Sequence, residues 1–140
     1  SHRLAPFEPV ELFGVRITPI PLLHGRLPIL GFRFEAAHGG GGRDHPVLPL
    51  VYATDTNAVP PETWPYLTDL GVLVLDGLRY RTHPTHFTID DAAWAAERIG
   101  AGRTFLVHMS HAVVYATADA ELRARSGGPV RLAFDGLVVS

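Results

Sequence analysis

The stretch Val51-Tyr52-Ala53-Thr54-Asp55-Thr56-Asn57 decides the fold prediction for this chain. It completes an apolar run over residues 48–53, and a run that is apolar on both faces predicts a strand buried inside a sheet. An aspartate flanked by hydroxyl side chains follows the run directly. We therefore expect Asp55 at the carboxyl end of a buried strand.

Two later segments repeat this arrangement. The apolar run 72–75 ends at Asp76, and the run 104–107 ends at His108. In open α/β sheets, ligands gather beyond the carboxyl ends of the strands, where side chains are held rigidly. The sequence therefore predicts that these strand ends form a site.

Helical patterns lie between these strands. Thr88 followed by Asp91 is typical of a capped helix start, apolar residues recur at helical spacing, and Gly100 predicts the end. A second, more polar helix is expected over residues 117–125, and a short one from residue 60 to 64. Strand–helix–strand–helix order favours an α/β architecture in which helices cover a mixed sheet.

The first third of the chain predicts antiparallel strands over residues 10–12, 15–20 and 30–36. Pro19 and Pro21 indicate that the second of these is an edge strand or ends there. Residues 38–45 contain four consecutive glycines and predict a surface loop. Asp135-Gly136 predicts a closing hairpin between strands 130–134 and 137–139.

Length and composition narrow the class of protein. The 140 residues, 46% hydrophobic and 19% charged, are enough for a single domain with a real core. The net charge of -2 gives no electrostatic case for a nucleic-acid binder. The lack of cysteine excludes disulfides and cysteine-based sites and fits a cytoplasmic location. No apolar run approaches the roughly 18 residues that a membrane span needs.

Metal ligation is the chemistry that the strand-end aspartates and histidines share. Imidazole and carboxylate suit zinc and manganese, and a two-metal site needs a carboxylate that bridges ions about 3.5–4 Å apart. Asp55 can bridge, and His24 and His108 can each bind one ion. A single histidine at a strand end is more often a hydrogen-bonded structural residue, so the prediction depends on their convergence.

Four segments of the chain together carry a family resemblance. They are Pro21-Leu22-Leu23-His24-Gly25, Tyr52-Ala53-Thr54-Asp55-Thr56, Asp76-Gly77-Leu78-Arg79-Tyr80-Arg81-Thr82-His83-Pro84-Thr85-His86 and Leu106-Val107-His108-Met109-Ser110-His111. In this order they resemble the carboxyl-terminal half of the metallo-β-lactamase superfamily. The branch they resemble most is that of phosphodiesterases similar to phosphoribosyl cyclic phosphate phosphodiesterase, which are relatives of ribonuclease Z.

The resemblance implies a site with two divalent ions, zinc or manganese. His24 matches the histidine that joins the first metal. Asp55 matches the bridging aspartate, and His108 matches the last ligand, which lies on the second metal.

The resemblance also implies catalytic residues that are not ligands. His86 matches a histidine that contacts the scissile phosphate or protonates the leaving group, and His83 competes for that role. Asp76 could orient this histidine by a hydrogen bond or could simply cap a turn. His111 could support the site by hydrogen bonds or could be exposed.

The motif that is most diagnostic of the superfamily, His-x-His-x-Asp-His, does not occur in this sequence. It belongs to the amino-terminal half of the αββα sandwich, so residues 1–140 are expected to form the other half, as a shortened form of a longer protein. The three predicted ligands would give each ion two protein ligands, whereas catalytic zinc usually has three and an open position. One sheet of a sandwich would also expose an apolar face, which favours pairing with another copy or with the absent half.

The resemblance therefore implies a metal-dependent phosphodiesterase as the full-length parent. Hydroxide held by the ions would attack phosphorus, and His86 would act as the general acid. The substrate stays open among a cyclic nucleotide-like phosphate, an RNA end, and an ester or lactone. Two alternatives are an isolated inactive half-domain, which we expect for these 140 residues alone, and a non-catalytic accessory protein with an incomplete metal site.

Overall fold

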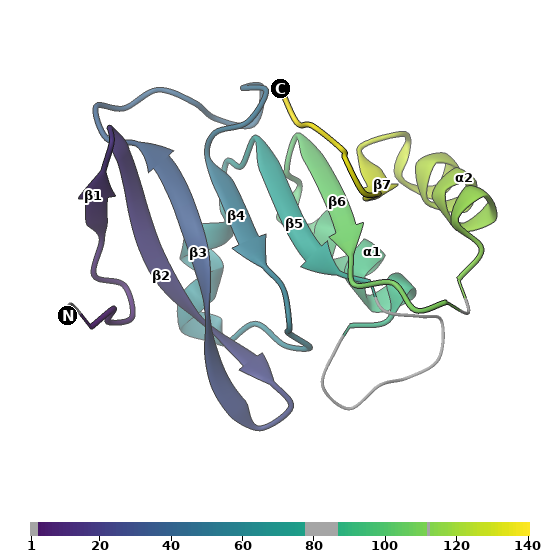
Figure 1. Ribbon diagram of the computed structural model, residues 1–140, viewed down its shortest axis with the longest axis horizontal. Helices are drawn as coiled ribbons and strands as arrows, with labels where there is room; N and C mark the ends of the chain where they lie inside the picture. Colours follow the sequence, from purple (N-terminus) through teal and green to yellow (C-terminus); the bar gives the residue numbers. More distant parts are fainter. Residues whose placement is uncertain (1–2, 78–86, 112) are drawn as a thin grey trace.

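The computed structural model describes residues 3–77, 87–111 and 113–140. Seven strands form one sheet in the order of the chain (Figure 1). The strands are β1 (Val10–Leu12), β2 (Val15–His24), β3 (Leu27–Ala36), β4 (Leu50–Ala53), β5 (Val72–Asp76), β6 (Arg103–Val107) and β7 (Val130–Leu132). Pairing is antiparallel from β1 to β4 and parallel from β4 to β7. The predicted mixed α/β sheet is therefore confirmed.

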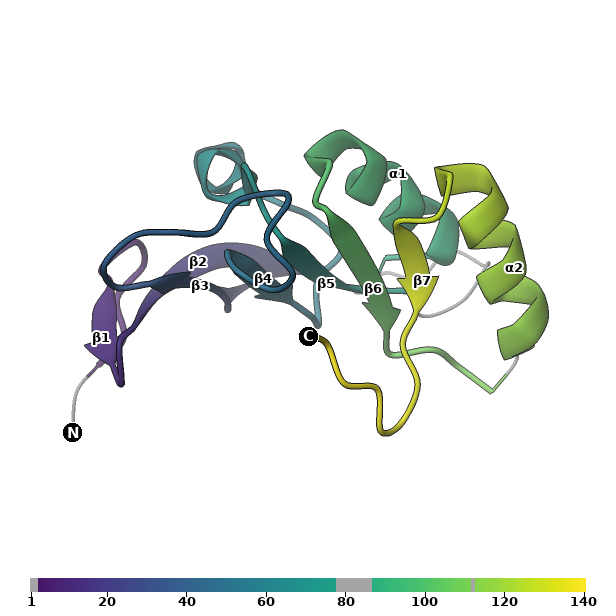
Figure 2. The ribbon, with the colours of Figure 1, turned by 90° about the horizontal axis from the view of Figure 1, so that it is seen from above.

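The 3₁₀ helix η1 (Pro61–Leu67) and the α-helix α1 (Ile89–Ile99) lie on one face of this sheet, and the α-helix α2 (Tyr115–Ser126) lies beside β7, as Figure 2 shows. The core forms between them and the inward-facing strand residues, which include Ile20, Val51, Leu73, Leu75 and Leu106. The three buried strand ends are thus anchored by packing from one side.

The opposite face, which we call the open face, carries Phe32, Phe34, Leu50, Tyr52, Val74 and Phe105. Side chains alternate along a strand, and on β4 to β6 these residues alternate with buried core residues, while Phe32 and Phe34 of β3 pair with Tyr52 and Leu50. Strand register aligns four of them in one row, from Phe32 through Tyr52 and Val74 to Phe105. Within the ranges that the structure describes, no second sheet covers this apolar surface.

The predicted start and end of α1 are confirmed. The Thr88 side chain accepts a hydrogen bond from the Asp91 backbone N–H at 3.0 Å. Gly100 adopts a left-handed conformation with φ of 67°, and its N–H donates to the Ala96 carbonyl. Cap and stop signals of this kind are local, so sequence alone could place this helix.

Of the two alternatives predicted for β2, the strand does not end at Pro19 or Pro21, because it continues to His24 as the partner of β3, but it is an edge at both prolines. Both prolines direct their backbone away from β3: the Pro19 carbonyl accepts from the Phe7 N–H, and the Pro21 carbonyl accepts from the Thr63 hydroxyl. A missing N–H on that side breaks no ladder hydrogen bond. Beside both prolines β2 is locally an edge, because β1 pairs only with residues 15–17.

The predicted closing hairpin is wrong. Asp135-Gly136 does form a turn, with the Leu137 N–H donating to the Phe134 carbonyl at 3.0 Å, but residues 137–140 form no strand. Side chains of α2 occupy the edge where such a strand would pair: the Leu132 N–H donates to Asp119, and the Leu132 carbonyl accepts from Tyr115. The backbone N–H and carbonyl of Leu132 at the edge of β7 therefore already have hydrogen-bond partners.

Other boundaries move by a few residues, and the short helix is of the 3₁₀ type. The glycine-rich segment is a loop, as predicted. Within this loop His45 is exposed, and its Nδ1 accepts hydrogen bonds from the Val47 and Leu48 N–H groups, which shapes the loop. None of the described helices is long and apolar enough to cross a bilayer.

Candidate metal centre

The parallel strands β4, β5 and β6 end at one edge of the sheet (Figure 1). Asp55 lies two residues beyond β4, Asp76 is the last residue of β5, and His108 directly follows β6. One ligand atom from each of these three residues lies within 4.8 Å of the others. The sequence predicted that these strand ends would gather, and the structure brings them together.

The distances fit a single divalent ion. His108 Nδ1 lies 3.3 Å from Asp55 Oδ1 and 3.5 Å from Asp76 Oδ1. Ligands that hold an ion tetrahedrally at about 2.0–2.2 Å stand about 3.3–3.6 Å from one another. Two carboxylates beside an imidazole also offer the charge and donor atoms that zinc or manganese prefers. The residues present therefore fit a metal.

Asp76 is the rigid member of this cluster. Its side chain is fully buried, and its Oδ2 accepts the Thr56 N–H at 2.8 Å. Thr56 is itself buried, and its hydroxyl donates to the carbonyls of Leu23 and Ala58. Asp76 thus fixes the loop that carries Asp55, and its carboxylate is positioned before any ligand arrives.

His24 approaches from a different strand. It ends β2, and its Nδ1 lies 2.8 Å from the Asp55 carbonyl oxygen. A carbonyl can only accept, so Nδ1 carries the proton and Nε2 carries the lone pair. Metal-binding histidines commonly donate their second nitrogen to a backbone carbonyl in this manner. A second contact fixes the turn between β2 and β3 to the loop that carries Asp55: the Gly25 N–H donates to the Asn57 side-chain oxygen at 2.9 Å.

Asp55 and His108 both adopt left-handed backbone conformations, with φ of 58° and 66°. Residues other than glycine rarely do so, and the cost is of the order of 1–3 kcal/mol each. Such strain clusters at functional sites, where the surrounding structure holds it. No sequence pattern in either segment predicted these left-handed conformations.

Two predicted site residues, His83 and His86, lie outside the described residues, so their roles stay predictions. The orienting role predicted for Asp76 stays one too, because it depends on His86. The sequence analysis grouped Asp76 with the other strand ends but did not assign it as a metal ligand, whereas in the structure its Oδ1 lies 3.5 Å from His108 Nδ1. Adjacent strand order for β4, β5 and β6 would have indicated this proximity. His111, for which two possibilities were left open, is exposed.

A family model described as the beta-lactamase superfamily domain matches residues 1–109. Among solved structures, a protein described as a new diphosphatase from the PhnP family is 33% identical in sequence to this chain, and the two structures align with a TM-score of 0.79. The metallo-beta-lactamase fold protein YhfI from Bacillus subtilis is 19% identical, with a TM-score of 0.72. A curated relative named octanoyltransferase, from Porphyromonas gingivalis, is 31% identical over 107 residues.

The matches cover most of this chain but only part of each relative. The alignments cover 95% of this chain but only 46% of the diphosphatase and 52% of YhfI. The octanoyltransferase match covers 76% of this chain and 19% of that protein. The chain thus spans about half the length of these solved relatives and about a fifth of the curated one. The strand-end cluster, the mixed sheet and the family match all agree with the resemblance seen in the sequence. The chain therefore belongs to the family of beta-lactamase superfamily domains.

Proposed function

We propose that this chain carries part of the active site of a metal-dependent hydrolase, and that the hydrolase is a phosphodiesterase. The observation that carries the proposal is the convergence of Asp55, Asp76 and His108 at the ends of three adjacent parallel strands. The relative described as a diphosphatase, at 33% identity, supports a substrate with phosphoryl groups.

Four side chains would hold the ions. We propose that the exposed Asp55 would bridge the ions, that Asp76 and His108 beside it would each add a ligand, and that His24, whose Nδ1 lies 2.8 Å from the Asp55 carbonyl oxygen, would bind through Nε2. Divalent ions at this position would supply Lewis acidity towards phosphoryl oxygens and the charge that develops on them. In this proposal His86 would donate a proton to the leaving oxygen, His83 is the competing candidate for that role, and Asp76 would orient the histidine by a hydrogen bond.

Four ligands are few for two ions. Catalytic zinc usually has three protein ligands and an open position, so further ligands would have to come from outside this set. We propose that they lie in a segment bearing His-x-His-x-Asp-His, and that residues 1–140 form the carboxyl-terminal half of a longer fold. Residues 1–140 alone would then bind metal weakly and would not turn over substrate.

The apolar open face also supports the proposal that this sheet pairs with a second sheet. A hollow of about 460 Å³ on that face is lined by Val15, Phe34, Leu48, Leu50 and Tyr52. Contiguous apolar surface of this kind usually marks an interface. We propose that a second sheet covers it, from the rest of the protein or, when residues 1–140 are alone, from a second copy.

Hydrolysis of bis(p-nitrophenyl) phosphate tests the proposed activity. The protein, in the full length that its gene encodes, is assayed with Mn²⁺ or Zn²⁺ beside its Asp55→Ala variant. We expect the variant to lose at least about 100-fold in kcat, as when a transition-state-stabilising group is removed from other enzymes. Asp44→Ala, which changes an exposed aspartate in the glycine-rich loop, is the matched control.

Equal rates for the wild type and Asp55→Ala would contradict the mechanism. A full-length protein that binds no metal and hydrolyses nothing would favour the accessory-protein alternative.

A further inference from the structure

A pocket of about 370 Å³ opens directly beside the candidate metal centre. Val107, His108 and Met109 form one wall at the end of β6, and Ala133, Phe134 and Asp135 form the other just beyond β7. The volume lies within the range of about 300–1,000 Å³ usual for small-molecule sites. His108 belongs both to this pocket and to the metal cluster, so the pocket and the candidate metal centre share a side chain.

The pocket offers a flat apolar surface. Phe134 is 54% exposed, so one part of its ring is available to a ligand. Tyr115 contacts the ring edge-on, with centroids 6.4 Å apart and planes at 89°, and the Tyr115 hydroxyl is anchored on the Leu132 carbonyl. Met109 adds an adaptable side chain that packs well against aromatic rings. This lining favours an aromatic group over a sugar rich in hydroxyls.

The walls are also held in place. The Ala133 N–H donates to the Leu106 carbonyl at 2.8 Å, which ties the end of β7 to β6. The turn at Phe134 is closed by the Leu137 N–H at 3.0 Å. A stacking surface on fixed strand ends needs little ordering when a ligand binds.

Asp135 sets the polarity of the pocket. It is an exposed carboxylate on the rim, and a carboxylate accepts hydrogen bonds and repels other anions. It therefore disfavours a phosphate in the pocket and directs phosphate to the ions. It also favours a ring that carries N–H donors.

We infer that this pocket binds the nucleobase of the substrate, so that the substrates are nucleotide-like phosphates and not simple sugar phosphates. The inference rests on the proposed function, since the phosphate is placed by the ions. Phe134 is then the residue that determines specificity, by stacking on the base.

Equilibrium binding of AMP and of ribose 5-phosphate tests this, because the two differ only in the base. Isothermal titration calorimetry on the full-length protein with Mn²⁺ is expected to show AMP binding about 5- to 150-fold more tightly, the range of one base stacked on an aromatic side chain. Phe134→Ala is expected to remove this preference, and Phe134→Tyr to keep it. Phe13→Ala, at the turn between β1 and β2 and far from the pocket in sequence, is the control and keeps the preference.

Equal affinities for AMP and ribose 5-phosphate would overturn the inference, and so would an AMP preference that is unchanged in Phe134→Ala. Circular dichroism of each variant separates loss of binding from loss of folding. The two proposals fail in different ways. Hydrolysis of bis(p-nitrophenyl) phosphate that requires Asp55, without an AMP preference, overturns the base pocket alone; an AMP preference without hydrolysis supports the pocket and contradicts the proposed activity.

Discussion

Asp55 and Asp76 are both strand-end aspartates, but they differ in burial and in hydrogen bonding. Asp76 is fully buried and accepts the Thr56 N–H, so it organises the loop as well as facing His108. Asp55 is 60% exposed at its side chain and contributes little to packing. Burial therefore predicts that the two positions respond differently to mutation.

Asp55→Ala is expected to lower Mn²⁺ or Zn²⁺ affinity at least about 10-fold while leaving the free energy of unfolding nearly unchanged. Asp76→Ala is expected to lower metal affinity and also to destabilise the fold by about 1–3 kcal/mol, because it leaves the buried Thr56 N–H without its acceptor. Calorimetric metal titration and urea unfolding measure the two effects, with Asp44→Ala as the exposed control. Unchanged metal affinity in both variants would contradict the site.

At the scale of elements, α2 and β7 are joined by one ion pair. Arg131 donates to both carboxylate oxygens of Asp119, at 2.9 Å each, and the Leu132 N–H donates a further hydrogen bond to Asp119 Oδ1. Burial opposes ionisation of Asp119, but these hydrogen bonds and the charges of Arg131 and Arg123 outweigh it, so its pKa lies below the ordinary 3.8. The ionised carboxylate therefore stabilises the sheet edge.

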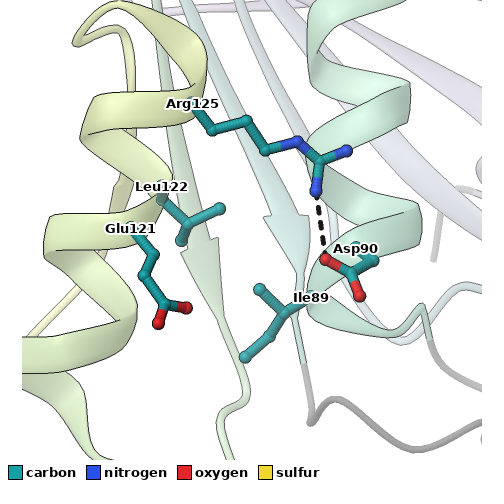
Figure 3. A pocket seen from close by; sticks show the side chains of 5 residues that line it. All are labelled: Ile89, Asp90, Glu121, Leu122 and Arg125. Atoms are coloured by element: carbon teal, nitrogen blue, oxygen red, sulfur yellow. Dashed lines mark hydrogen bonds and ion pairs between the residues drawn. The ribbon is translucent and has the colours of Figure 1, made fainter.

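The contact between α1 and α2 is of a more exposed kind. Figure 3 shows Arg125 reaching from α2 to Asp90 on α1 beside Ile89 and Leu122, and the two charges lie 3.0 Å apart. Both side chains are largely exposed, at 44% and 65%. Exposed pairs of this type contribute about 0–1 kcal/mol, so Asp90 is a suitable reference for Asp119.

Asp119→Asn is expected to lower the free energy of unfolding at pH 7 by about 1–3 kcal/mol, because charge-assisted hydrogen bonds are lost. A lowered pKa means that this contribution is complete above the unfolded-state pKa near 3.8 and disappears as the pH falls through the still lower folded-state pKa. The difference between wild type and variant should therefore be constant from neutral pH down to about pH 5 and shrink below pH 3.8.

Urea unfolding measured as a function of pH checks this, with Asp90→Asn expected to cost less than about 1 kcal/mol throughout. A difference between wild type and Asp119→Asn that grows on acidification would have the wrong sign.

At the scale of the whole molecule, the sheet has η1 and α1 on one face, as Figure 2 shows, and strand register places an apolar row on the other. Residues 1–140 expressed alone are expected to self-associate through the open face. Light scattering should report a dimer or a larger species, and Phe34→Glu should shift it towards monomer. Phe13→Glu, at the fully exposed turn, should not. A monodisperse monomer of the unmodified chain at high concentration would count against pairing.

Local signals were sufficient for much of the fold. The apolar runs before Asp55, Asp76 and His108 predicted three buried strands, and Thr88 with Gly100 predicted α1, because periodicity and capping depend on neighbours in sequence. The errors arose where a distant element intervened. Asp119 and Tyr115 occupy the edge at which a final strand was expected, and the prolines of β2 direct their backbones to the side away from β3.

The sequence by itself determined the kind of chemistry: aspartate and histidine at strand ends, a resemblance carried by motifs, and a fold class that the family match confirms. Only the tertiary structure decided which of these groups meet. Register between β4, β5 and β6 places Asp76 between Asp55 and His108, and the left-handed backbones of Asp55 and His108 complete the arrangement. The physical reason is that strand pairing joins residues far apart in the sequence, 22 positions from Leu50 to Val72 and 31 from Val72 to Arg103, which periodicity within one segment does not encode.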